Sequence, residues 1–317
     1  MIVRDRPSGL RLFFVLKGSI LSRIWIVLLV NIVLAILVTI FHGDLFSIKI
    51  TLTAIPFTLL GLPLAIFLGF RNNAAYDRYW EARKLWGQLL ADARTMARQC
   101  AHLIQAPNPP ATPSGSNDDP TDRPKRMILK TIAFAHALKH QLRGTQADTD
   151  LDGLLSASER TRFADHPTPT VFLLDELGAD LGQCIREKRI DPCLAANIDT
   201  TLSGMVSVAA GCERIKNTPI PFSYTLLLHR TAYLYCFLLP FGLVDSIGFM
   251  TPFVVAVVAY TFFGLDALGD EIEEPFGLKD NDLPLDALSR TIEYNLRTAQ
   301  GERNLPAPPL PEHYCLM

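Results

Sequence analysis

The chain has 317 residues, 49% hydrophobic and 20% charged, with a net charge of −2. Its mean hydropathy of +0.21 is too high for a typical water-soluble protein, yet the chain carries too many charges to lie wholly in lipid. A membrane portion joined to a sizeable cytosolic portion fits this composition. The near-neutral charge, with no basic patch among aromatic residues, gives no indication of a nucleic-acid partner.

Two apolar runs follow an arginine-rich N-terminal segment. The first run, 24–41, is long enough to span a membrane and has no small-residue cleavage site, so it predicts a retained span rather than a signal peptide. The second run, 48–70, contains Pro56 and Pro63. Prolines inside a span usually mark a bend, so we expect a shaped helix rather than a straight anchor.

The second run changes character at its end. Nothing is charged up to Phe70, whereas a charged stretch begins at Arg71 and contains no glycine or proline before Gly87. This pattern predicts one long helix that leaves the membrane near Phe70 and continues into water. Two rows recur within it at four-residue spacing, a large row and a small row: Leu62, Ile66 and Phe70, and Gly61, Ala65 and Gly69.

These two rows allow two interpretations. The small row would form a packing seam, because small residues let helices approach closely in lipid, and the large row would then face whatever the helices surround. Alternatively, the large row is an ordinary lipid-facing or core surface, since every spanning helix contains such rows. Periodicity alone favours the second interpretation.

The region 71–219 is expected to be helical and cytosolic. After the long helix, a proline-rich loop at 106–125 has too little apolar surface to order itself. Further helices are predicted at 125–142, 171–188 and 193–217. An acidic, loop-like stretch separates the first two of them, and no strand pattern stands out.

Two more spans are predicted at 224–244 and 247–265. Basic residues cluster before the first span, after the second and before the third, whereas the links at 42–47 and 245–250 carry none. The positive-inside rule therefore puts both termini in the cytosol, with the chain crossing the inner (plasma) membrane four times. The domains expected in chain order are a cytosolic N-terminal segment at 1–23, two spans at 24–70, the cytosolic helical region at 71–219, two spans at 220–265 and a cytosolic C-terminal segment at 266–317.

His229 and Arg230 lie inside the third span, where ionisable residues are costly and often functional. If the last two spans form a hairpin that turns near Gly248, Arg230 and Asp266 lie at matched depth. We therefore predict an ion pair between Arg230 and Asp266 near the cytosolic face, and we interpret His229 as a packing residue.

No motif for catalysis, phosphate binding, dinucleotide binding or zinc is found, so no enzyme, cofactor or metal site is predicted. The stretch 148–159 does match the calcium-loop pattern, with Asp148 and Glu159 at its ends. Because it lacks a partner loop and solid flanking helices, the pattern leaves calcium binding open. The six cysteines have no paired spacing, and disulfides are not expected in the cytosol.

Three sequence blocks resemble the bestrophin family, in its bacterial branch: GFRNNAAYDRYWEARKLWGQL after the second span, TPIPFSYTLLLHR before the third and GLDALGDEIEEPFGLKDNDLPLD after the fourth. The resemblance implies an all-α homopentameric ion channel, with four transmembrane helices per chain around a central pore. It implies a hydrophobic neck at Leu62, Ile66 and Phe70, and a cytosolic aperture at Ile220. This makes the pore-facing interpretation of the large row the preferred one.

The resemblance has limits. In calcium-activated animal bestrophins an acidic cluster follows Pro-Phe-Gly, after an asparagine; here Glu274 takes that position, and Leu278 and Lys279 interrupt the cluster. Calcium gating through this segment is therefore not expected. The bacterial branch favours small monovalent cations, with chloride as the alternative. Two other functions stay open: a membrane-anchored scaffold or receptor, and a membrane-anchored enzyme.

Overall fold

The computed structural model describes residues 1–4, 9–12, 15, 17–41, 44–45, 48–49, 53–105 and 122–316. Most of the proline-rich loop predicted at 106–125 lies outside these residues. The described elements are α1 (Gly9–Leu12), α2 (Leu21–Ile40), β1 (Asp44–Leu45), β2 (Ile48–Lys49), α3 (Ala54–Leu103), α4 (Arg123–Arg143), α5 (Ala157–Asp165), α6 (Pro169–Arg186), α7 (Pro192–Asn217), α8 (Phe222–Ile247), η1 (Gly248–Met250), α9 (Thr251–Glu273) and α10 (Leu285–Ala299). The all-α prediction is confirmed; the strands among the described residues are β1 and β2, of two residues each, which pair as a short antiparallel hairpin.

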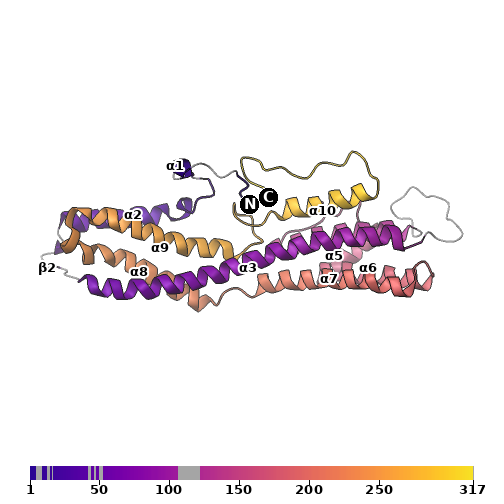
Figure 1. The fold of residues 1–317 in the computed structure, drawn as a ribbon, viewed down its shortest axis with the longest axis horizontal. Coiled ribbons are helices and arrows are strands. Elements are labelled where there is room, and N and C mark those ends of the chain that lie inside the picture. Colours follow the sequence, from indigo (N-terminus) through magenta and orange to yellow (C-terminus); the bar gives the residue numbers. More distant parts are fainter. Residues whose placement is uncertain are drawn as a thin grey trace.

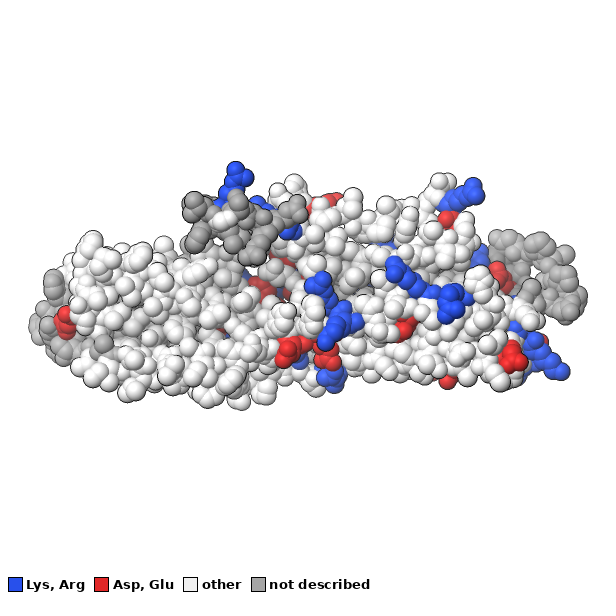
Figure 2. All heavy atoms as spheres, in the orientation of Figure 1, with Lys and Arg blue, Asp and Glu red and all other residues white. Residues whose placement is uncertain are grey.

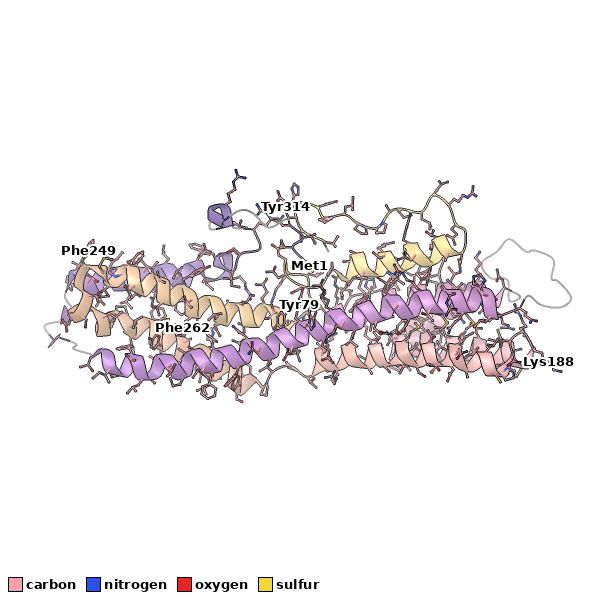
Figure 3. The ribbon with its side chains drawn as sticks, viewed as in Figure 1. Met1, Tyr79, Lys188, Phe249, Phe262 and Tyr314 are labelled. Carbon is pink, nitrogen blue, oxygen red and sulfur yellow. The ribbon has the colours of Figure 1, made fainter. Side chains whose placement is uncertain are left out.

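The molecule is elongated and has two halves, which α3 joins along its whole length (Figure 1). One half contains α2, α8, α9 and the first part of α3; the other contains α4 to α7, α10 and the rest of α3. Phe249 and Lys188 mark the two ends (Figure 3). On the face shown in Figure 2, charged side chains gather over the second half and are nearly absent from the first. The first half therefore has the surface of a membrane domain.

By length and composition, four stretches among the described residues could cross a membrane: Leu21–Ile40, Ile55–Leu103, Pro192–Asn217 and Phe222–Glu273. The last stretch contains both α8 and α9, so the four predicted spans correspond to α2, the start of α3, α8 and α9. The remaining stretch is α7, whose apolar face packs into the core of the second half. Burial against other helices explains the apolar composition of α7 without a membrane.

The long helix predicted across the apolar boundary is confirmed, because α3 continues without a break from Ala54 to Leu103. Its predicted start was wrong, since Ile48 belongs to β2. Pro56 was expected to interrupt the helix but lies in its first turn, where a missing N–H costs no helical hydrogen bond. Pro63 is the proline inside the helix.

The first half packs around α8 and α9, with α2 and α3 each contacting both of them. Leu64 and Leu68 of α3 are buried against Leu228 and Ala232 of α8. On the other side, Ile24 of α2 joins a buried cluster from α8 and α9. The first half is thus layered, with α2 and α3 as its outer members.

The second half has one hydrophobic core, to which α3, α4, α6, α7 and α10 contribute. Trp86 of α3 and Phe134 of α4 are among its fully buried side chains. Helix α4 ends at Gly144, which adopts the left-handed conformation (φ 68°) that favours glycine at a helix end. The helix predictions for α4, α6 and α7 are confirmed to within a few residues.

Helix α5 lies within the acidic stretch that was expected to be mainly a loop. A capping box starts it: the Ser156 hydroxyl accepts from the Glu159 N–H, and the Glu159 carboxylate accepts from the Ser156 N–H. Glu159 also binds Lys130 of α4 at 2.9 Å, and Lys130 is 2% exposed. Glu176 and Asp180 of α6 complete the surroundings of this lysine at 3.2 and 2.7 Å. One buried ammonium therefore ties α4 to both α5 and α6.

This cluster predicts a loss of stability in acid. Burial raises the pKa of Glu159, but the Ser156 N–H and the Lys130 ammonium lower it more strongly, so that its pKa falls from 4.5 to about 2. A depressed carboxyl pKa stabilises the fold above pH 4.5, and this contribution is lost as the pH falls toward 2. The Glu159→Gln variant lacks this carboxyl group, so we expect its loss of stability across this pH window to be smaller by about 3 kcal/mol.

The measurement is thermal unfolding of the full chain in detergent at a series of pH values. Asp175→Asn, which changes an exposed carboxylate of α6, is the control. If Glu159→Gln lost as much stability in acid as the unaltered chain, ionised Glu159 would not be the source of this pH dependence.

Candidate ion pathway

The three predicted neck residues lie on an exposed face of α3. Leu62, Ile66 and Phe70 are 66%, 47% and 58% exposed in the single chain, although all three are large and apolar. Leu64 and Leu68 of the same helix are 3% and 0% exposed. At about 100° per residue, the exposed row is centred about 180° from the buried pair. The side of α3 that carries this row therefore points directly away from the rest of the chain.

The predicted small row does not form a packing seam within the chain. Only Gly61 meets a neighbouring helix: a Cβ added there would lie 2.9 Å from the Tyr235 hydroxyl of α8. Ala65 is exposed, and a Cβ added at Gly69 would meet nothing within 4 Å. Ala65 and Gly69 flank the large row instead, and within the chain Leu64 and Leu68 do the packing.

The charged end of the apolar stretch is fixed by Arg71, whose side chain is 0% exposed. Its Nη1 donates to Asp266 Oδ1 of α9 at 2.7 Å, and its Nη2 pairs with Asp270 one turn later. Asn72 adds a bond from Nδ2 to the Leu265 carbonyl oxygen at 3.0 Å. Two carboxylates around one guanidinium compensate the cost of burying its charge. We call Arg71, Asp266 and Asp270 the boundary clamp.

The predicted ion pair between Arg230 and Asp266 is wrong. The two oxygens of Asp266 are bound by Arg71 and by His229, whose Nδ1 lies 2.6 Å from Oδ2. Arg230 is exposed on the surface of α8. Arg230 and His229 lie at nearly the same depth, but a helix turns about 100° between neighbours, so only His229 faces α9. His229 is thus a polar partner of the clamp rather than a plain packing residue.

Two turns beyond Arg71, Arg78 joins α3 to the other helices of the second half. Its guanidinium donates to three backbone carbonyls, those of Ile215, Thr218 and Glu273. Burial lowers the pKa of Arg78, and the nearby Glu273 and Glu274 oppose this effect. The arginine therefore holds the end of α7 and the end of α9 to the same side of α3.

Ile220, the predicted aperture residue, follows directly on this junction. Its backbone N–H donates to Glu273 Oε1 at 2.9 Å, and the residue is partly exposed. Tyr224, at the start of α8, donates its hydroxyl to the Phe67 carbonyl of α3 at 3.1 Å. The predicted neck and aperture are therefore connected through α3, α8 and the last turn of α9. The sequence shows Arg71 as the first charge after a long apolar run, but it did not indicate that Arg71 and Arg78 hold the helices together.

In the calcium-like stretch at 148–159, carboxylates form ion pairs with basic side chains instead of leaving a free set of ligands. Asp150 accepts from Lys139 and from Arg290, and Glu159 is held by Lys130. Within the described part of the chain, no group of three or more His, Cys, Asp or Glu side chains is placed to hold a metal. The acidic segment after α9 is similarly engaged: Asp282 is buried and accepts from the Lys279 N–H at 2.8 Å.

Four apolar helices at one end, a charged helical half at the other and a helix that joins them define an all-α membrane protein. Comparison with known proteins identifies the family within this class. The family model described as "Bacterial/Fungal Bestrophin protein" matches residues 1–298. The chain belongs to this bestrophin family, which confirms the resemblance seen in its sequence.

Its relatives cover nearly the whole chain. A protein of Mesorhizobium japonicum named as a voltage-dependent anion channel-forming protein is 42% identical over 98% of this chain and 94% of its own length. A protein of Escherichia coli K12 with the same description is 40% identical over the whole of both chains. A solved bacterial bestrophin homolog from Klebsiella pneumoniae is 40% identical, with a TM-score of 0.80 over 88% of this chain and 100% of that one. These similarities support an ion channel.

The boundary clamp predicts that substitutions of two arginines differ strongly in how much stability they remove. Arg71→Gln leaves two carboxylates without their buried cation, and removing one partner of a buried pair costs about 3–5 kcal/mol. Arg230→Gln, the matched control, changes an exposed arginine and is expected to cost less than about 0.5 kcal/mol. Thermal unfolding of both variants in the same detergent measures the difference. Equal losses of stability in the two variants would show that the ion pairs of Arg71 contribute no more to stability than an exposed arginine does.

Proposed function

We propose that this chain forms a homopentamer around a central pore and conducts small monovalent ions passively across the membrane. In this proposal Leu62, Ile66 and Phe70 line a hydrophobic neck, and Ile220 forms a second constriction on the cytosolic side. The observation that carries it is the exposed apolar row of α3, which lies opposite the face that α3 buries against its own chain. In a ring of identical chains, such a row can face the axis while the buried face holds the helix in place.

The arrangement of the first half supports this orientation. Helices α2 and α3 both contact the α8–α9 pair but are not among each other's main neighbours, so they form different edges of the half. α2 exposes a broad apolar surface that includes Leu29, Val33 and Leu37, as expected of a helix in lipid. Placing α2 toward lipid leaves α3 on the side where copies of the chain would meet. Ala65 and Gly69, which flank the large row, would allow a neighbouring helix to approach closely.

A neck of this kind would act as a gate by dewetting. A narrow ring of apolar side chains excludes water, so ions cross only when it widens or becomes hydrated. No charged side chain lies on α3 from Ala54 to Phe70, and the neck therefore offers no group that selects the sign of the ion. The relatives named as anion channel-forming proteins support anions such as chloride. Conduction of cations, the first expectation from the bacterial branch, is the alternative.

We also propose that both termini lie in the cytosol and that the protein is a multi-pass protein of the inner membrane. The termini lie side by side, since the Val3 N–H donates to the Tyr314 carbonyl at 2.8 Å (Figure 3). They therefore share one side of the molecule. The basic residues before α2 and after the apolar part of α3 make the cytosol the favoured side. A role as scaffold, receptor or anchored enzyme has no comparable support, because the relatives from Mesorhizobium japonicum and Escherichia coli K12 are named as channel-forming proteins.

Shortening the side chains that line the neck tests the proposal. Leu62→Ala, Ile66→Ala and Phe70→Ala together should widen the ring, and a barrier lower by about 1.4 kcal/mol would raise the current about tenfold. Leu29→Ala, Val33→Ala and Leu37→Ala form a matched control, since this row has the same spacing on α2. Planar bilayer recordings of the purified variants measure both currents.

The control variant is expected to conduct like the unaltered chain. Absence of current from the unaltered chain and from the neck variant, both as folded pentamers, would rule out the channel. The reversal potential under a salt gradient, from the same recordings, decides between anions and cations. A chain that stays monomeric in mild detergent at all concentrations would be inconsistent with a central pore.

A further inference from the structure

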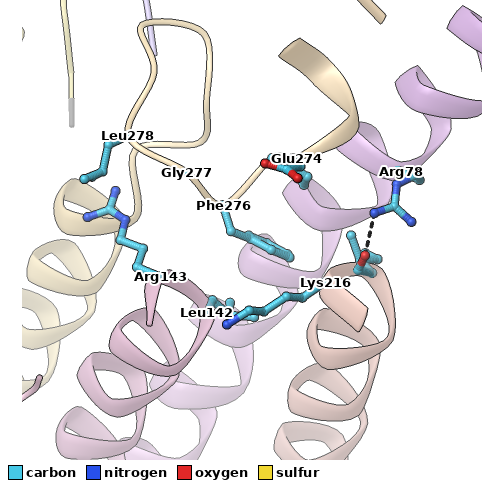
Figure 4. A pocket seen from close by; sticks show the side chains of 10 residues that line it. Arg78, Leu142, Arg143, Lys216, Glu274, Phe276, Gly277 and Leu278 are labelled. Carbon is cyan, nitrogen blue, oxygen red and sulfur yellow. Dashed lines mark hydrogen bonds between the residues drawn. The ribbon is translucent and has the colours of Figure 1, made fainter. Parts of the chain in front are cut away.

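We propose that a cavity at the junction of the two halves binds a small organic anion, a compact dicarboxylate. The cavity has a volume of about 440 Å³ and lies where α3, α4 and α7 meet the loop that follows α9 (Figure 4). This volume falls in the range of small-molecule pockets, roughly 300–1,000 Å³. Neither the proposed neck nor the proposed aperture contributes a residue to its lining.

The charged groups that line the cavity are mostly cations. Arg78, Arg143 and Lys216 come from three different helices, and the only carboxylate in the lining is Glu274. Arg78 donates only to backbone carbonyls, and the Lys216 ammonium donates to the Gln141 carbonyl at 2.7 Å. Among the described residues, no carboxylate forms an ion pair with either of them. Two positive charges at the cavity therefore lack a directly bound counter-ion.

Arg143 supplies a second, independent indication. Its side chain is only 7% exposed, and Nη1 pairs with Asp286. Its Nε–H is buried and has no hydrogen-bond partner in the part of the chain that the structure describes. Buried N–H groups nearly always have an acceptor, so this one indicates a missing partner. A carboxylate oxygen in the cavity would be an acceptor of the required charge.

The apolar part of the lining favours an organic anion over an inorganic one. Leu142, Ile215 and Phe276 line the cavity and are buried, which gives it apolar walls. Figure 4 shows Leu142 and Phe276 among the lining side chains. A short carbon chain with a carboxylate at each end would place charge at the cations and methylene groups against the apolar walls.

Occupancy would act on the proposed aperture, and this consequence rests on the proposed function. Lys216 lies four residues before Ile220, and Glu274 follows Glu273, whose carboxylate accepts from the Ile220 N–H. A ligand that bridges α7 and the loop after α9 would hold both supports of Ile220 in the arrangement seen here. A ligand shifts a conformational equilibrium only by its difference in affinity for the two states.

The test is isothermal titration calorimetry of the full chain in detergent, at constant ionic strength, with succinate, glutarate, acetate and phosphate as probes. We expect saturable binding of succinate or glutarate. Lys216→Gln should weaken it about tenfold, as expected for one lost charge-assisted hydrogen bond. Glu274→Gln, which removes the competing carboxylate, should strengthen it. Both residues are exposed, so neither change threatens the fold.

Lys188→Gln is the control, since Lys188 is an exposed lysine at the far end of the cytosolic half (Figure 3). Its affinity should equal that of the unaltered chain. No saturable heat with either dicarboxylate, or an affinity unchanged in both cavity variants, would overturn the proposal. Phosphate bound as tightly as succinate would overturn the requirement for a carbon chain. Because binding is measured without current, it succeeds or fails independently of the channel.

Discussion

One buried arginine marks the end of the apolar part of α3 and locks this helix to α9. Arg71 follows directly on the apolar part of α3 and is held by Asp266 and Asp270 of α9. A buried charge without partners would cost several kcal/mol, so α3 cannot rotate or slide past α9 without breaking both pairs. The orientation of Phe70, the adjacent residue, is thereby set as well. The clamp thus determines which face of the apolar segment points outward.

Helix α3 carries this constraint into the second half of the molecule. It is continuous over 50 residues, and Arg78 fixes it a second time through the ends of α7 and α9. Glu273, at the end of α9, binds the backbone of Ile220. The same two helices, α3 and α9, therefore position both proposed constrictions. A shift of α9 along α3 would disturb the clamp and the aperture support together, which makes this pair of helices a natural place for coupling between them.

The sequence was sufficient for features that depend on composition and period. It predicted the four apolar segments, the long helix that continues from the apolar into the charged stretch, and the helical second half, because each depends on residues close together in the chain. It failed where a contact depends on the direction in which a side chain points around its helix axis. Depth matching brought Arg230 and Asp266 to one level, but the side chain that faces Asp266 belongs to His229, one residue away. It left calcium binding at 148–159 open, because it could not show that Asp150 pairs with Lys139 and Glu159 with Lys130, both on the preceding helix α4.

The boundary clamp also bears on how the proposed pore would choose its ions. Arg71 is the charge nearest to the neck on α3, and its side chain is fully buried and neutralised by α9 rather than presented to the outward face. Leu62, Ile66 and Phe70 carry no charge themselves. In the proposed pore an ion would thus leave its hydration shell without gaining a fixed opposite charge. The neck would then control how easily ions pass, and discrimination by sign would arise at the wider, polar parts of the pathway.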